Sequence, residues 1–227
     1  MRLIFCTLMI MFAISSSAPA TFAQDLKTTR IWEELEKIEK SRPLRSSRYI
    51  SSKAVISDRV LDKTNRVIGE IRDVVLDRNG AISYLNIDFN RLRLGTGPIL
   101  VDYDEMGLRP ASNGYKMGYT DDDIRARLPQ ILSNIESASG QETDTYSIKN
   151  LVGHTLYSAD GRKLGAIEDI LFDHGGYRAE LLYVALSHKS AHGKSLAIPF
   201  REAYYKTEKL ILKNDYADTI LVFAQEK

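Results

Sequence analysis

Alternation of apolar and polar residues is the main pattern of this chain, and it predicts β-strands. An apolar-rich run at Val67–Asp77 is followed by a glycine-containing turn and then by Leu85, Ile87 and Phe89, which alternate with polar residues. A period of two is typical of a strand with one buried face. Between the runs, residues 77–80 (Asp-Arg-Asn-Gly) favour a tight hairpin, because Asn-Gly readily adopts the positive φ angles of primed turns. We therefore expect a hairpin that buries Leu85, Ile87 and Phe89.

The hairpin pattern occurs twice. Residues 66–77 return as residues 162–173 at an offset of 96, and residues 85–89 return as 182–186 at an offset of 97. The additional residue falls in the turn between the two strands. Self-similarity at a fixed offset indicates a duplicated domain. We expect the inward-facing residues of the second copy to be Leu182, Val184 and Leu186.

The repeat predicts a mainly β fold. Four further short strands are expected, two in each copy, at residues 99–103, 115–119, 196–200 and 209–213. Several short strands in each copy favour a small barrel or sandwich. We therefore predict two tandem small β-barrels, at residues 51–119 and 147–227, with short helical segments before and between them.

The segment between the copies, residues 120–146, is predicted to be a helical linker. Thr120 suits the N-cap, and the three aspartates at 121–123 suit the first turn, where they favour the positive end of the helix dipole. These aspartates lack the alternating spacing and the later glutamate of a calcium loop. Pro129 predicts a break or kink, and thus two short helical pieces. Polar residues 137–145 then lead to the second copy.

Another helix is expected within residues 24–50 and ends before Pro43. Its apolar stripe consists of Ile31, Trp32, Leu35 and Ile38. An amphipathic helix commonly covers its own core, so packing on the first barrel is one interpretation. A partner contact is the other, because tryptophan is enriched at interface hot spots. These four residues are therefore our candidate partner-contact residues.

The first 23 residues have the order of a cleaved secretion signal. Arg2 supplies a positive start, and the apolar run at residues 3–14 is too short to span a bilayer comfortably. We predict cleavage after Ala23, with a second possible site at residues 18–20. An uncleaved anchor or a buried core helix is the alternative. Export would make the mature protein periplasmic.

Composition narrows the classes of function. The chain has 31 basic and 30 acidic residues, and loss of Arg2 with the signal leaves a mature chain near zero net charge. Such a chain has no general electrostatic attraction to nucleic acid or anionic lipid. The only cysteine, Cys6, also leaves with the signal, which excludes a disulfide or a thiol site from the mature protein. No other segment is long and apolar enough to cross a membrane.

Histidines are the first candidates for chemistry. His188 and His192 are four residues apart, a spacing that suits metal binding on a helix. Their segment is predicted to be a polar hairpin loop, however, and two ligands fall short of a usual zinc set. We therefore interpret them as solvated loop residues and predict no metal site.

Aspartates that recur in both copies are the second candidates. They are Asp73, Asp77, Asp169 and Asp173. Paired carboxylates can serve acid–base catalysis, but aspartates beside turns commonly accept backbone hydrogen bonds. We expect this turn role. No Gly-x-Ser-x-Gly motif occurs, and the glycines at residues 95–97 lack a phosphate-loop lysine. We predict no catalytic residue and no cofactor, and hence no enzyme.

The two copies resemble the PRC-barrel family. Residues 68–77 and 164–173 have its core pattern of a glycine, alternating apolar residues, an aspartate, an apolar run and a second aspartate. Pro199 and Phe200 are similar to the proline–aromatic step of that family, whereas Asp102 stands at the matching position of the first copy. The family includes the cytoplasmic domain of the photosynthetic reaction-centre H subunit and the C-terminal domain of a ribosome maturation factor.

This resemblance implies small β-barrels that bind other proteins and have no known catalytic machinery. The predicted signal argues against the two cytoplasmic roles, and the chain then resembles the exported PRC-barrel proteins of Gram-negative bacteria. The expected function is a non-catalytic periplasmic binding or scaffold module of the cell envelope, with another envelope protein as its partner. A periplasmic small-ligand or metal-binding protein is the alternative, followed by a hydrolase with an unrecognised site.

Overall fold

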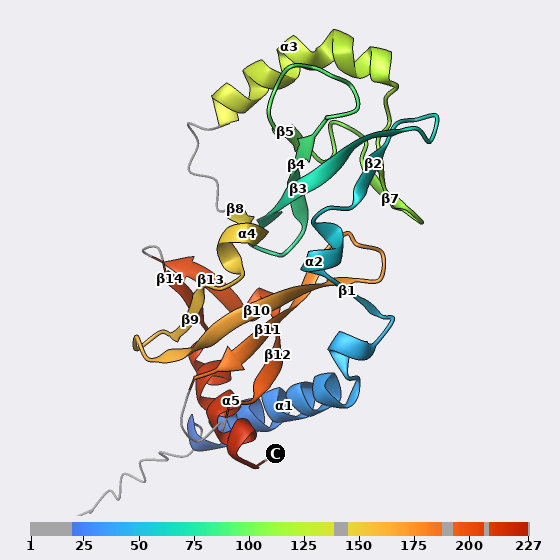
Figure 1. Cartoon of the computed structure of the whole chain (residues 1–227). Helices are drawn as coiled ribbons and strands as arrows, with labels where there is room; N and C mark the ends of the chain where they lie inside the picture. The colour runs from blue at the N-terminus through green and yellow to red at the C-terminus, as the bar shows by residue number, and fades with distance from the viewer. Residues whose placement is uncertain (1–19, 139–144, 188–192, 207–208, 227) are drawn as a thin grey trace, which may run out of the picture.

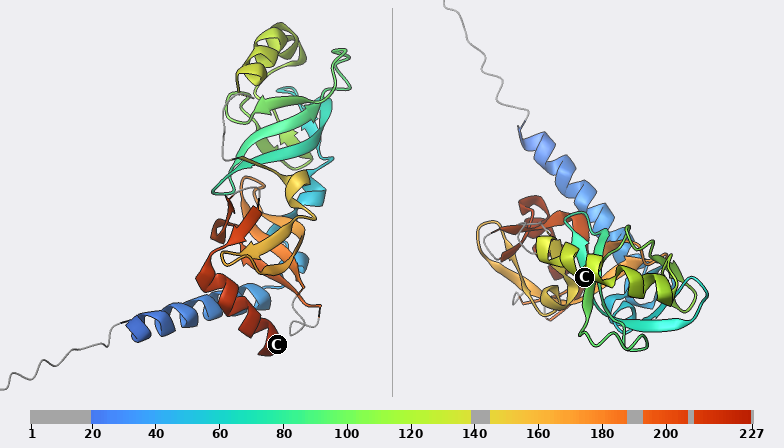
Figure 2. Two further views of the ribbon diagram at one scale, coloured as in Figure 1. Left: turned by 90° about the vertical axis from the view of Figure 1, so that its left-hand side faces the viewer. Right: turned by 90° about the horizontal axis from the view of Figure 1, so that it is seen from above.

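The computed structural model describes residues 20–138, 145–187, 193–206 and 209–226. The protein is mainly β, as predicted, and its strands form two seven-stranded sheets. The sheets are stacked end to end in an elongated molecule (Figures 1 and 2). Within these residue ranges neither sheet closes into a barrel.

The first sheet follows the order β5-β4-β3-β2-β7-β6, and β8 pairs with the far end of the long strand β3. Its strands are β2 (Arg59–Leu61), β3 (Val67–Asp77), β4 (Ile82–Asp88), β5 (Ile99–Asp102), β6 (Arg109–Ala111), β7 (Gly114–Lys116) and β8 (Thr145–Ser147).

The second sheet follows the order β12-β11-β10-β9-β14-β13, and β1 pairs with the far end of β10. Its strands are β1 (Tyr49–Ser51), β9 (Thr155–Ser158), β10 (Lys163–Asp173), β11 (Ala179–Leu186), β12 (Ser195–Pro199), β13 (Ala203–Lys206) and β14 (Lys209–Leu212). The two strand orders correspond, strand for strand.

The register of the central hairpins also corresponds. Ile71 lies opposite Ile87 in the first sheet, and Ile167 lies opposite Val184 in the second. In both hairpins the register shifts directly after this pair, which marks a bulge with one additional residue, Arg72 or Glu168, directly before Asp73 and Asp169. The predicted inward residues are all buried: Leu85, Ile87, Phe89, Leu182, Val184 and Leu186.

The turn of the first hairpin differs from the primed turn that Asn-Gly predicted. Only Gly80 has a positive φ, of 85°, whereas Asn79 does not. The backbone N–H of Gly80 donates to the carbonyl of Asp77, and Asp77 in turn donates to the carbonyl of Ala81. The loop is therefore longer by one residue than a two-residue turn, and only its glycine needs the left-handed conformation.

Each sheet contains one strand that, in the chain, directly precedes the repeat forming the other sheet. β1 precedes the first sheet in the chain but pairs with β10, where Tyr49 lies opposite Asp173. β8 precedes the second sheet but pairs with β3, where Thr145 lies opposite Asp77. Each exchanged strand continues into a short helix, α2 (Ser52–Val55) or α4 (Ile148–Leu151). The domain boundaries predicted from the sequence, at residues 51 and 147, do not take this reciprocal exchange into account.

The exchange joins the two sheets through one buried core, which contains residues from both. The two hairpin turns also meet. The N–H of Ala179 donates to the carbonyl of Gly80 at 2.8 Å, and the Tyr115 hydroxyl donates to the carbonyl of Gly176 at 2.7 Å. The sheets therefore form one folded body.

Helices lie at both ends of the molecule (Figure 2). α3 (Asp121–Ala138) is a single helix, so the break predicted at Pro129 is wrong. Buried Ile124 and Ile131 lie on either side of the proline and anchor the helix, which tolerates one missing backbone donor. The later part of the predicted linker, residues 139–144, lies outside the described residues.

The first helix, α1 (Ala20–Lys40), packs on α5 (Asn214–Glu226) and on β12 of the second sheet. The sequence interpretation that it covers the first barrel is therefore wrong. The sequence could not show this position, because only the exchange of β1 brings the N-terminal segment to the second sheet. The predicted cleavage point after Ala23 falls in the first turn of α1, and residues 1–19 lie outside the described residues.

Candidate functional site

Asp77 and Asp173 hold the hairpin turns, as predicted. The Oδ1 atom of Asp77 accepts the backbone N–H groups of Asn79 and Ala81, each at 2.8 Å. Asp173 accepts those of Tyr177 and Arg178 in the longer turn of the second copy. Both carboxylates are thus engaged with backbone.

Asp73 and Asp169 do not have the predicted turn role. Asp169 is buried and accepts the hydroxyl of Ser51 at 2.5 Å and that of Ser52 at 2.6 Å, both from the exchanged β1–α2 segment. Asp73 likewise accepts the hydroxyl of Ser147 at 2.5 Å, from the exchanged β8–α4 segment. These aspartates therefore tie each sheet to a strand that belongs to the other repeat, and none of the four recurring carboxylates is free for acid–base chemistry.

The described histidines are used locally. The Nδ1 atom of His154 lies 2.7 Å from the carbonyl of Asn150, and that of His174 lies 2.9 Å from the carbonyl of Ser47. His188 and His192 lie outside the described residues. In the part of the chain that the structure describes, no three His, Cys, Asp or Glu side chains gather as a metal site would require.

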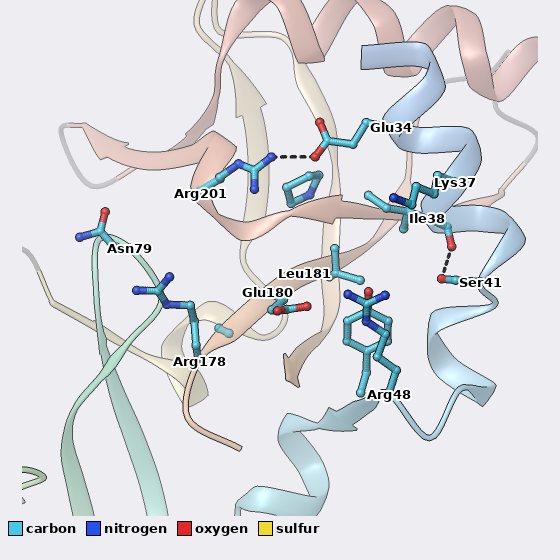
Figure 3. A pocket seen from close by; sticks show the side chains of 13 residues that line it. Glu34, Lys37, Ile38, Ser41, Arg48, Asn79, Arg178, Glu180, Leu181 and Arg201 are labelled. Atoms are coloured by element: carbon cyan, nitrogen blue, oxygen red, sulfur yellow. Dashed lines mark hydrogen bonds and ion pairs between the residues drawn. The ribbon is translucent and has the colours of Figure 1, made fainter. Parts of the chain in front are cut away.

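A hollow of about 400 Å3 lies where α1 meets the second sheet, and it is the candidate functional site. Its walls come from α1, the segment at β1, the β10–β11 turn, β11 and β12, with Asn79 from the first sheet at its edge. We call it the basic hollow, after the charged side chains that line it: Lys37, Arg48, Arg178, Arg201, Glu34 and Glu180 (Figure 3). Four basic groups and two carboxylates give it a net charge of +2.

One side of the basic hollow is a fixed network. Arg201, in the 3-10 turn η3 (Phe200–Glu202), pairs with Glu34 of α1 at 2.7 Å. Glu34 also accepts the hydroxyl of Tyr216 from α5. Burial and the neighbouring Glu34 carboxylate raise the pKa of Tyr216, so this hydroxyl remains protonated and continues to donate. The network fixes α1 to the second sheet and thereby shapes one wall of the hollow.

The other side carries cations without carboxylate partners. Among the described residues, no carboxylate lies within 4.0 Å of Lys37, Arg48 or Arg178. Arg48 lies 5.7 Å above the ring of Tyr49, and all three side chains are exposed. Figure 3 shows Arg48 and Arg178 on opposite sides of Glu180. The hollow can therefore offer positive charge to a bound group.

Sequence reasoning did not find this site, although a signal for it was present. Arg178 and Arg201 of the second copy correspond to Ala81 and Asp104 of the first at the offset of 97. A comparison of the two copies for charge, and not only for apolar pattern, would have marked both arginines. The contribution of α1 could not be found in this way, since α1 has no place in the repeat.

The predicted partner-contact residues are mostly engaged within the chain. Ile31 and Leu35 are buried, and Trp32 packs edge-on against Phe223 of α5, with ring centroids 4.9 Å apart. Ile38 is half-buried and lines the basic hollow. The stripe is therefore not a free surface in this structure, and Ile38 is its link to the candidate site.

Residues 143–219 match the PRC-barrel domain family. The matched PRC-barrel segment runs from just before β8 into α5, so it includes one strand of the first sheet and does not include β1. No curated protein matches the chain.

The PRC-barrel segment supplies the β10–β11 turn, β11, β12 and η3 of the basic hollow, whereas α1 and the segment at β1 come from outside it. No helix among the described residues has both the length and the apolar character needed to span a membrane.

Proposed function

We propose that the protein is a non-catalytic binding module of the cell envelope, built from two PRC-barrel-type units. The family match at residues 143–219 supports the second unit. The same strand order, the same register and the same bulge aspartate support the first. The predicted signal at residues 1–23 supports export to the periplasm.

One observation carries the proposal of binding without catalysis. The carboxylates that recur in both copies are engaged in holding turns and exchanged strands, whereas Lys37, Arg48 and Arg178 of the basic hollow have no carboxylate partner among the described residues. Groups committed to the fold are poorly suited to proton transfer, and uncommitted groups at a surface hollow are suited to recognition.

Affinity purification tests this function. The full-length chain, tagged at its C-terminus and expressed in its own cells, is recovered from the envelope fraction with whatever co-purifies. We expect a stoichiometric envelope protein. N-terminal sequencing of the recovered chain should begin at Gln24. An intact Met1 end would refute the export step, and recovery of the chain alone would refute the binding role.

A second function, the binding of a small periplasmic ligand, is favoured by the volume of the basic hollow. About 400 Å3 falls in the range of small-molecule sites. Thermal-shift measurements against panels of organic acids, sugars and divalent metals distinguish this function from protein binding. A saturable rise in melting temperature with one compound, without a protein partner, would favour it.

A further inference from the structure

We propose that the basic hollow recognises an acidic segment of a partner protein, a short stretch rich in Asp or Glu. This inference rests on the proposed function as a binding module and adds the chemistry of what is bound. It follows from the cations that the fold leaves unpaired, from the difference between the two copies, and from the open, polar form of the hollow.

The unpaired cations are the first observation. Lys37 comes from α1, Arg48 from the segment before β1, and Arg178 from the β10–β11 turn, so three separate elements bring them to one hollow. None lies within ion-pair distance of a carboxylate among the described residues. Arginine presents a planar fork that matches a carboxylate with two parallel hydrogen bonds. The hollow thus offers donors in the form that an acidic side chain uses.

The difference between the copies is the second observation. Arg178 lies directly opposite Ala81 in an isolated bridge between the two hairpin turns, so the two corresponding positions meet at the centre of the molecule. The fold accepts alanine at this position in one copy and arginine in the other. The positive charge of Arg178 is therefore not a requirement of this turn, which is what a recognition role predicts.

The form of the hollow favours a protein segment over a small molecule. Small-molecule sites are mostly apolar and enclose most of their ligand. This hollow is lined largely by charged and polar side chains, and apolar Ile38, Leu181 and Pro199 provide a short floor. It also draws on α1 and on both sheets, through Asn79 and Arg178. An extended acidic segment can place carboxylates at several such points at once.

The balanced charge of the chain makes the hollow selective. The whole chain has a formal charge of +1, so it does not attract anions in general. A local net charge of +2 then directs an acidic segment to this place. Glu180 works against such binding because its carboxylate lies in the same hollow. Removal of the arginine charges should therefore weaken the binding of an acidic segment, whereas removal of the Glu180 charge should strengthen it.

The probe is a fluorescent hexaglutamate peptide with blocked ends, titrated with purified protein produced from the full-length chain. Anisotropy is measured at about 0.15 M salt and again at about 0.5 M, where exposed charges are more strongly screened. Hexaglutamine, inorganic phosphate and citrate are titrated in parallel. We expect saturable binding of hexaglutamate that weakens with salt, and no binding of hexaglutamine.

Three variants locate the binding. Replacing both arginines, Arg48→Ala with Arg178→Ala, should weaken hexaglutamate binding about tenfold or more. Glu180→Gln should strengthen it about threefold, since a repelling carboxylate is removed. Arg91→Ala is the matched control, because Arg91 is an exposed arginine of the first sheet's β4–β5 loop, and it should leave binding unchanged. Melting curves confirm that each variant is folded.

The outcomes separate this inference from the proposed function. Equal binding by the wild type and the double variant would overturn the site, and no binding of hexaglutamate would overturn the acidic segment. Binding of citrate or phosphate alone at these arginines would also overturn it, in favour of a small anion. If affinity purification captures an envelope protein equally with the double variant, the binding function stands and this site does not.

Discussion

At the scale of single residues, one aspartate in each central hairpin decides how the two halves are joined. Asp73 and Asp169 occupy the same place in the two copies, and each accepts serine hydroxyls from the strand that arrives from the other repeat. The sequence predicted that these aspartates matter in both copies, but it assigned them to turns. Their partners are far away along the chain, and no local pattern reveals such a distance.

Replacing Asp169 by alanine should lower the free energy of unfolding by about 2–4 kcal/mol, because it leaves the hydroxyls of Ser51 and Ser52 without their acceptor. Urea denaturation measures the loss. Asp104→Ala is the control, since that side chain is 90% exposed, and it should change stability by about 0.5 kcal/mol or less. Equal losses in the two variants would contradict the role of Asp169.

Asp62 provides a test in pH. Burial alone would raise the pKa of this carboxyl group, but hydrogen bonds from Thr64 and Arg66 outweigh burial and lower it. Because the pKa of Asp62 is lower in the folded state, its ionised carboxylate stabilises the protein at pH values above the unfolded-state pKa of about 4. This contribution is lost as the pH falls through the folded-state pKa.

Asp62→Asn should therefore lower the melting temperature at pH 7, and the gap between the two proteins should narrow below about pH 4. Melting curves from pH 3 to pH 8 measure this. A gap that stays constant down to pH 3 would show that the ionised carboxylate does not contribute.

At the scale of elements, the terminal helices are the part that the sequence predicted least well. The apolar stripe of α1 predicts a helix correctly, whereas no helix is predicted from the sequence at α5. Tyr216, Ile220 and Phe223 recur at helical spacing and are buried, so the signal was present. The central strands were easier to predict, because their apolar pattern occurs twice at nearly the same offset. Which sheet α1 covers depends on the strand exchange, which alternation does not encode.

Trp32→Ala should lower the free energy of unfolding by about 2 kcal/mol or more, because Trp32 packs on Phe223 and partly fills the contact between α1 and α5. Thermal denaturation followed by circular dichroism measures the change. Leu26→Ala, in the same helix but at a position 72% exposed, should have little effect. If Trp32→Ala left stability unchanged and reduced partner capture, the stripe would be an interface after all.

At the scale of the whole molecule, the two sheets share one core and exchange strands, so they should unfold together. The sequence predicts the two units of this arrangement but not the way in which they are joined. The repeat predicted two corresponding units and the buried face of each hairpin. The exchange could not be predicted, because β1 and β8 are short and carry no mark that distinguishes one sheet from the other.

Val184→Asp tests this coupling. Val184 is fully buried in the second sheet, and an unpaired charge at this position should cost several kcal/mol. Because the sheets are joined, hydrogen exchange should increase in β3 and β4 of the first sheet as well as in the second. Val222→Asp, at a position 50% exposed in α5, is the control. Loss of protection confined to the second sheet would show that the sheets unfold independently.

The reciprocal placement of β1 and β8 within one chain also means that dilution does not remove either strand from its sheet. If the same two strands were exchanged between separate molecules, their pairing would require association of two chains. The folded fraction would then fall as the protein was diluted. Here both strands are tethered to their destinations, so the local concentration of each is set by the length of the connecting chain. The pairing of β1 with β10 and of β8 with β3 therefore does not depend on the protein concentration.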